Sequence, residues 1–180
     1  MALAFIAEID ANSVDTENLV FTGIPQTYES LQLMGVGNTD YALSQGMNGV
    51  FSLQFNEETT DSKHAFMRIA SDYNGVLSNN EGTFNSNYGE CGSMSGTDPE
   101  SGYYPATYII DIYNYLGVAA TGDVQYFAQS GTATAGGLYN HVAYYAGTYG
   151  NGATPITSLQ LKCSFDNWLR YSKFSLYGRD

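Results

Sequence analysis

The side chains that could carry out chemistry in this chain are two histidines, two cysteines and eighteen carboxylates. His64 lies in a polar stretch that leads into an apolar run, and His141 follows an asparagine. Neither histidine has a second histidine or a cysteine at metal-ligand spacing, which argues against a zinc site. No Gly-x-Ser-x-Gly motif marks a serine nucleophile either. We therefore expect no metal and no acyl-transfer chemistry.

The carboxylates could in principle form the acid pair of a glycosidase or an irregular calcium site. Most of them fall in polar, turn-rich stretches, where solvation is the simplest interpretation. Asp111 is the exception, because it lies in the apolar run 108–113. Alternation places Tyr108 and Ile110 inward and Asp111 outward, and a buried calcium-binding or catalytic Asp111 is the alternative. No EF-hand loop or phosphate-binding glycine motif occurs, so we expect no enzyme and no cofactor.

Tyrosine is the one functional side chain that is abundant, with sixteen Tyr and nine Phe against one Trp. It combines a large apolar ring with a hydroxyl, which suits both protein interfaces and sugar binding. Strand tyrosines such as Tyr108, Tyr126, Tyr144 and Tyr171 are expected to fill or border the core. Tyrosines in or beside loops are expected to be exposed and available to a partner.

The charge of the chain is strongly acidic and uneven. Eighteen acidic residues face six basic ones, the formal net charge is -12, and no Lys or Arg occurs between Arg68 and Lys162. Nucleic acid and anionic membranes require basic side chains and are excluded as partners. Most basic residues gather near the C-terminus, where they meet either an acidic partner or solvent. The candidate interface residues are Tyr88, Tyr103, Tyr104, Tyr149, Lys162, Arg170, Lys173 and Arg179.

Length and composition predict one domain spanning residues 1–180. A domain of this size buries roughly 70% of its surface, and only 13% of its residues are charged, about half the usual ~25%. Cys91 and Cys163 have no metal-ligand spacing and are expected to be independent reduced thiols. The apolar run at the start is too short and wrongly flanked for a signal peptide or a membrane span, which predicts folding in a cytoplasm.

The elements that must position these residues are strands, because apolar side chains alternate with period two along the chain. Residues 51–55 and 157–165 show this most clearly. Glycine and asparagine clusters, including 35–38 and 147–152, mark turns, and residues 82–102 form a long irregular loop suited to partner contact. The pattern predicts an antiparallel β-sandwich or barrel. Further strands are expected at residues 3–9, 18–22, 30–35, 65–71, 106–115, 124–129, 141–145 and 171–177.

Two stretches carry a recognisable pattern. Residues 24–31 read Ile-Pro-Gln-Thr-Tyr-Glu-Ser-Leu and are followed later by Phe-Asn at 55–56. The C-terminal part contains Ile-Thr-Ser-Leu at 156–159 and Tyr-Ser-Lys-Phe-Ser-Leu-Tyr-Gly at 171–178. These stretches resemble structural proteins of tailed bacteriophages, especially those of marine and cyanobacterial hosts.

The resemblance implies a jelly-roll-like β-sandwich in a virion, commonly assembled as trimers on the capsid or in tail fibres. It implies that Pro25 fixes a turn, that Tyr28 packs at a corner, and that Leu31 and Leu33 begin the core face. In the last strand, Phe174 is expected to help close that core.

The leading hypothesis is a capsid decoration or cement protein at the virion surface, a homotrimer that contacts the major capsid protein or other virion proteins. The alternative is a tail or tail-fibre adhesin that binds a host surface glycan through its Gly-, Asn- and Tyr-rich loops. The number of copies per particle separates the two, because a decoration protein covers the whole lattice and an adhesin sits at the tail.

Overall fold

The computed structural model describes residues 2–11, 16–42, 50–59, 63–71, 77–80, 88–93, 95–97, 105–117, 123–132, 141–150, 153–163, 167–168 and 172–180. Within these residues the chain forms thirteen strands and no helix. The strands are β1 (Leu3–Asp10), β2 (Asn18–Thr22), β3 (Ser30–Ala42), β4 (Val50–Phe55), β5 (His64–Ser71), β6 (Leu77–Asn80), β7 (Gly89–Ser93), β8 (Ser95–Thr97), β9 (Ala106–Tyr113), β10 (Asp123–Thr132), β11 (His141–Gly150), β12 (Ser158–Cys163) and β13 (Lys173–Arg179).

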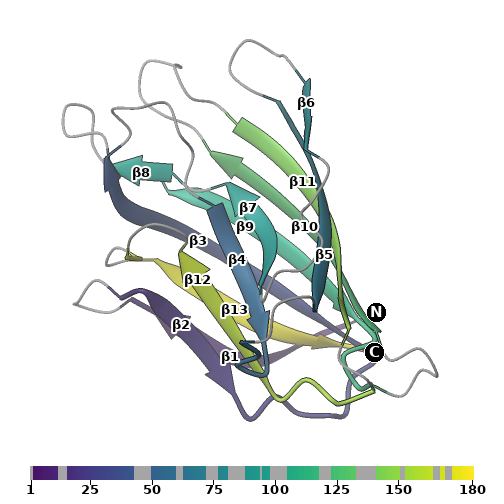
Figure 1. Ribbon diagram of the computed structural model, residues 1–180. Coiled ribbons are helices and arrows are strands. Elements are labelled where there is room, and N and C mark those ends of the chain that lie inside the picture. Colours follow the sequence, from purple (N-terminus) through teal and green to yellow (C-terminus); the bar gives the residue numbers. More distant parts are fainter. Residues whose placement is uncertain are drawn as a thin grey trace.

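The strands form two sheets that pack face to face (Figure 1). The large sheet has nine strands in the order β1-β13-β3-β9-β10-β11-β5-β6, with β8 joined to β3. The small sheet has four strands in the order β2-β12-β4-β7. The pair β3 and β8 is parallel, and the remaining paired strands are antiparallel. The predicted all-β, antiparallel sandwich in one domain is confirmed.

Eight of the strands follow a nested pairing scheme. β1 pairs with β13, β2 with β12, β3 with β9 and β4 with β7, so the chain folds as one long hairpin whose successive pairs lie in alternate sheets. This arrangement is the wrapping of a jelly roll. β5 and β6 are inserted in the chain between β4 and β7, and β10 and β11 between β9 and β12. These four inserted strands, called the extension below, lengthen the large sheet beyond β9.

The core between the sheets comes from the alternating strands. In β9 and β12 every second residue is buried, including Ile110 and Leu161. An aromatic cluster fills one end, where the ring of Phe51 lies 5.3 Å from that of Trp168 and 5.7 Å from that of Phe174. The Trp168 indole N–H donates to the Leu161 carbonyl at 3.3 Å, which satisfies its only donor.

The corner predicted from the pattern at residues 24–31 is present. The Tyr115 hydroxyl donates to the Pro25 carbonyl at 2.8 Å and accepts from the Tyr28 backbone N–H at 3.1 Å. The Tyr28 ring covers Gly178, where an added Cβ would lie 2.2 Å from a ring carbon. Leu31, next along the chain, is fully buried. The predicted packing of Tyr28 at this corner is therefore confirmed.

Two glycine clusters were expected to form turns and instead lie inside strands. Gly35 belongs to β3, where a Cβ would meet the Phe174 ring at 2.3 Å. Gly147 belongs to β11, where a Cβ would meet the Tyr126 ring at 2.1 Å. Glycine is needed at both positions because an aromatic ring packs directly on the backbone. The turn prediction at residues 35–38 and 147–150 is therefore wrong.

The irregular loop expected at residues 82–102 is also partly wrong. β7 lies within it and pairs with β4, and β8 pairs with β3. The sequence of β7, Gly-Glu-Cys-Gly-Ser, has little apolar alternation, but Cys91 and Gly92 are buried against the core. Residues 82–87, 94 and 98–102 lie outside the described residues.

Neither Cys91 nor Cys163 forms a disulfide, and both are buried, as expected of independent thiols. The Cys91 thiol donates to the Phe51 carbonyl at 3.4 Å, and burial raises the pKa of this thiol well above its usual value. Among the described residues, no helix has the length and apolar character needed to cross a membrane.

Candidate functional site

The outward side of the large sheet carries an unusual number of exposed apolar side chains. Strand register places them next to one another, since Ile109 lies opposite Gln129, Gln129 opposite Tyr144, and Tyr144 opposite Ile69. These positions belong to β9, β10, β11 and β5, so the surface is continuous across four strands. The apolar face, as we call it, consists of Met67, Ile69, Ile109, Tyr113, Phe127, Val142 and Tyr144, each between 42% and 53% exposed.

A hollow of about 600 Å³ lies within the apolar face. Small residues line it where β5 and β11 pair, namely Ala65, Ala146 and Gly147. The larger side chains of Met67 and Phe127 border it, because both lie opposite Ala146 on the neighbouring strands. Tyr113, Gln125 and Thr148 also line the hollow, which leaves a mainly apolar depression with a few polar groups.

The apolar face carries almost no charge. Asp111 is the outward acid next to it, and its carboxylate binds the Arg179 guanidinium at 3.2 Å and accepts a hydrogen bond from the Gln32 amide at 2.7 Å. The outward position predicted for Asp111 is therefore confirmed, and its charge is compensated within the chain. Asp123 lies at the end of β10, at the border of the face. The other outward positions of β9, β10, β11 and β5 among the described residues hold apolar or neutral polar side chains.

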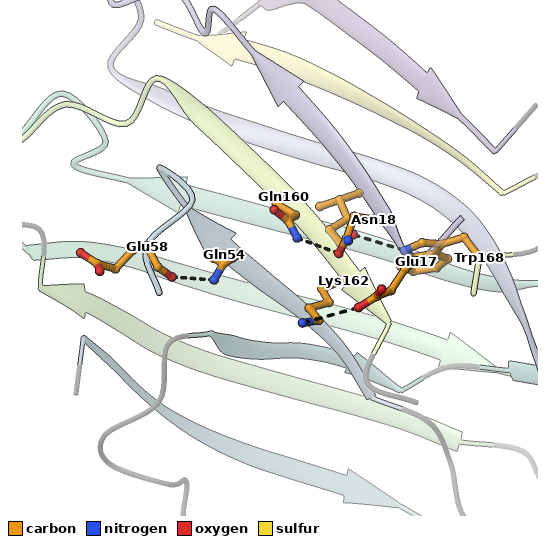
Figure 2. A network of polar contacts seen from close by, with 8 residues as sticks. Glu17, Asn18, Gln54, Glu58, Gln160, Lys162 and Trp168 are labelled. Carbon is orange, nitrogen blue, oxygen red and sulfur yellow. Dashed lines mark hydrogen bonds and ion pairs between the residues drawn. The ribbon is translucent and has the colours of Figure 1, made fainter. Parts of the chain in front are cut away.

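The outward side of the small sheet has the opposite character. Gln160 donates from its amide to the Asn18 side-chain oxygen at 2.7 Å, and the Lys162 ammonium lies 3.7 Å from the Glu17 carboxylate (Figure 2). The Gln54 amide of β4 donates to the carbonyl of Glu58, which follows that strand (Figure 2). Polar groups thus bond to one another across this surface, whereas no described segment covers the apolar face.

Of the four candidate tyrosines, the structure describes two. Tyr88 is 37% exposed, immediately before β7. Tyr149 was expected to be exposed and is not, since it is only 3% exposed and its ring lies 5.2 Å from that of Phe55. The reason is that residues 147–150 continue β11, which turns Tyr149 toward the core. Tyr103 and Tyr104 lie outside the described residues.

The basic candidates do not form one surface. Lys162 lies on the small sheet, whereas Lys173 and Arg179 lie on β13 of the large sheet. Lys173 and Arg179 stand at opposite ends of β13, roughly 20 Å apart at the rise of a strand. The Lys173 ammonium binds the Glu8 carboxylate at 2.7 Å, and this bond raises the pKa of Lys173 and lowers that of Glu8. Arg170 lies outside the described residues.

His64 occupies an unexpected environment. It is the first residue of β5, yet it is only 2% exposed and its two ring nitrogens have no hydrogen-bond partner in the described structure. Its ring stacks on Phe55 at 5.7 Å and lies 4.7 Å from the Tyr149 ring. Burial lowers the pKa of His64 to about 4, so the imidazole is neutral at pH 7. His64 therefore packs in the core as a neutral aromatic ring.

The sequence contained one signal of the apolar face that alternation alone did not reveal. In residues 108–113, 66–70 and 126–128, apolar side chains occupy both faces of a strand instead of one. Apolar side chains on both faces are characteristic of strands covered on both sides. The inward side is covered by the small sheet, and the outward side is the apolar face.

Comparisons with protein-family models, with curated proteins and with solved structures find no match to this chain. No group of three or more His, Cys, Asp or Glu side chains gathers at one point in the part of the chain that the structure describes. The apolar face is thus the surface whose physical character most needs a functional explanation.

Proposed function

We propose that this chain is a structural protein that acts through protein–protein contacts, and that it decorates and stabilises the capsid of a bacteriophage. The observation that carries the contact role is the apolar face, which is uncharged on a chain with a net charge of -12. The virion setting is supported by the resemblance at residues 24–31 and 171–178. The trimer and the capsid partner remain predictions from that resemblance.

The size of the apolar face supports a contact role. Seven large side chains that are 42% to 53% exposed leave roughly 600 Å² of surface, at about 200 Å² for a fully exposed side chain. The largest apolar patch on an ordinary monomer is about 300–600 Å² and is often functional. Covering this face would contribute on the order of 15 kcal/mol before the costs of association.

The distribution of charge supports the same role. A protein packed at high density on a particle needs a charged exterior for solubility and an uncharged surface where it binds. Among the described residues, the acids beside the apolar face are Asp111, which is paired with Arg179, and Asp123 at its border.

The experiment is to add the purified chain to particles of the encoding phage that lack it, and to image them by electron cryomicroscopy. We expect many copies over the whole capsid lattice. Phe127→Glu places a charge in the apolar face and should abolish this binding. Phe5→Glu is the matched control, because Phe5 is 61% exposed on β1 of the same sheet but distant from the face. Binding of a few copies at the tail alone would contradict a decoration role.

An adhesin that binds a host glycan is the second candidate, and the hollow favours it in one respect. Tyr113 and Phe127 offer ring faces beside the Gln125 amide and the Thr148 hydroxyl, and sugars bind to such combinations of aromatic and polar groups. The site would then lie on the sheet and not in the loops. Binding of the isolated chain to host polysaccharide, lost in Tyr113→Ala, would support this candidate over decoration.

A further inference from the structure

The apolar face lies mainly on the extension and not on the eight strands of the jelly roll. Met67 and Ile69 come from β5, Val142 and Tyr144 from β11, and Phe127 from β10. The two insertions are separate in the chain, yet β11 and β5 pair over eight residues. The inserted strands therefore create an additional sheet surface whose outward side nothing in the chain's described part covers.

This surface has a protruding group beside a depression. Tyr144 projects outward from β11 and is 45% exposed. Ala146 projects outward two residues further along, roughly 7 Å away, and lines the hollow. The hollow, at about 600 Å³, has room for an aromatic side chain. A protrusion and a matching depression on one surface are the requirement for a two-fold contact, in which each copy offers both.

The chemistry of the hollow suits a tyrosine. Phe127 and Tyr113 border it and provide ring contacts for an entering aromatic side chain. The buried hydroxyl of that side chain needs a hydrogen-bond partner, and Gln125 and Thr148 supply polar groups in the same hollow. A sugar ring would bring several hydroxyls to these two polar side chains, whereas a tyrosine brings one.

The area and the charge also fit a second copy. With the neighbouring Gln125, Gln129 and Thr107, each copy offers roughly 800 Å², the amount that each partner buries in an interface of standard size. Two sheets pack face to face at about 10 Å with their strands nearly aligned, which is the geometry expected for this contact. Among the described residues, Asp111 is already paired with Arg179, and Asp123 lies at the border of the face, where it can stay in contact with water.

We infer that the apolar face binds a second copy of this chain about a two-fold axis that passes between Tyr144 and Ala146, with Tyr144 of each copy seated in the hollow of the other. This inference rests on the proposed contact role of the apolar face and names a second copy as the partner that covers it. The dimer then binds the capsid through its other surfaces, and Phe127→Glu prevents that binding by breaking the dimer. It differs from the trimer implied by the resemblance, because a self-complementary patch pairs copies two at a time.

The test is sedimentation of the full chain over a wide range of concentration, at low and at high salt. We expect a monomer–dimer equilibrium that tightens as salt rises, since both copies carry a net charge of -12 that salt screens. Tyr144→Glu and Ala146→Trp should each weaken the dimer at least 30-fold, as expected when a central aromatic contact is lost or its pocket is filled. Phe5→Glu should leave the dimer unchanged.

The double variant Tyr144→Ala/Ala146→Trp provides a sharper test. The tryptophan clashes with the tyrosine of the other copy, so removal of that tyrosine should recover part of the affinity lost in Ala146→Trp. Thermal unfolding of each variant checks that it is folded.

A chain that is monomeric throughout, or a trimer unaffected by Tyr144→Glu, overturns the inference. So does polysaccharide binding that depends on Tyr113 in a monomeric chain. If a monomer binds capsids, the proposed function stands and the dimer does not. If the chain forms the dimer but does not bind capsids, the dimer stands and the proposed function does not.

Discussion

Replacement of His64 by phenylalanine should make the stability of this chain less sensitive to acid. The imidazole is 2% exposed, and neither ring nitrogen has a hydrogen-bond partner among the described residues. Desolvation lowers its pKa from 6.5 to about 4, and the nearby Glu58 carboxylate opposes this only in part. The folded state therefore binds a proton less readily than the unfolded state does.

The sign and size of the effect follow from this difference. The contribution of neutral His64 to stability is complete above pH 6.5, is lost as the pH falls toward 4, and does not change further below that. At about 1.4 kcal/mol for each pKa unit, the loss amounts to about 3 kcal/mol. A phenylalanine cannot bind a proton, so this part of the acid sensitivity should vanish in His64→Phe.

The assay is urea unfolding of both proteins at pH 7.5 and at pH 4. The other titrating groups are the same in both chains, so their contributions cancel when the two losses of stability are compared. His64→Gln serves as a control, since it keeps polar atoms but cannot become charged, and it should also lose the acid sensitivity. Equal losses in all three proteins would refute the assignment of a neutral, buried His64.

Three further outcomes are expected. Gly178→Ala should destabilise the fold by about 1–3 kcal/mol in urea unfolding, because its Cβ would lie 2.2 Å from the Tyr28 ring; a smaller cost in a Tyr28→Ala background would identify this contact as the cause. Cys91 and Cys163 should resist iodoacetamide in the folded protein and react in urea, since both thiols are buried; rapid labelling of either one in the native state would contradict their positions. Asp111→Asn should cost about 1 kcal/mol through loss of its partly exposed ion pair, and a cost that does not fall at high salt would point to another cause.

The fold could be predicted because alternation of apolar side chains reports directly which side of a strand is buried. The expected strand at residues 18–22 coincides with β2, and the expected strand at 51–55 differs from β4 by one residue. Both strands lie in the small sheet, which has one buried side and one polar side. The alternation of apolar and polar residues was therefore easy to read in strands that have one buried side and one side exposed to solvent.

Prediction was wrong where a glycine served packing instead of a turn. Gly35 and Gly147 interrupt the apolar pattern, and a single sequence does not tell which ring will lie on them. The same error led to the prediction that Tyr149 is exposed. The strand that turns its side chain inward was expected to end at residue 145 and in fact continues to Gly150. β7 was missed because its pairing with β4 depends on residues far away in the chain.

The candidate site was the least predictable part. Expectation centred on loop tyrosines and on a C-terminal group of basic residues, whereas Lys162 and Lys173 lie on different sheets. Tyr144 was expected to fill or border the core and is 45% exposed on the apolar face. Some strands have apolar side chains on both faces, and the sequence of such a strand does not tell which face stays exposed. That depends on the number of strands in each sheet, which is a property of the whole fold.

In the extension, the residues that stabilise the fold and the residues proposed to bind a partner lie on opposite sides of the sheet. Its inward residues, including Val124, Tyr126 and Ala143, are buried in the same core as the jelly roll. The strands that carry the apolar face are thus held rigid before any partner arrives, which reduces the ordering cost of association. Its outward residues contribute little to that core, so Phe127 or Tyr144 can change without loss of the fold. A chain built in this way can strengthen or redirect its contacts through substitutions on the outward side of the extension, while the nested pairing of the eight jelly-roll strands keeps the domain intact.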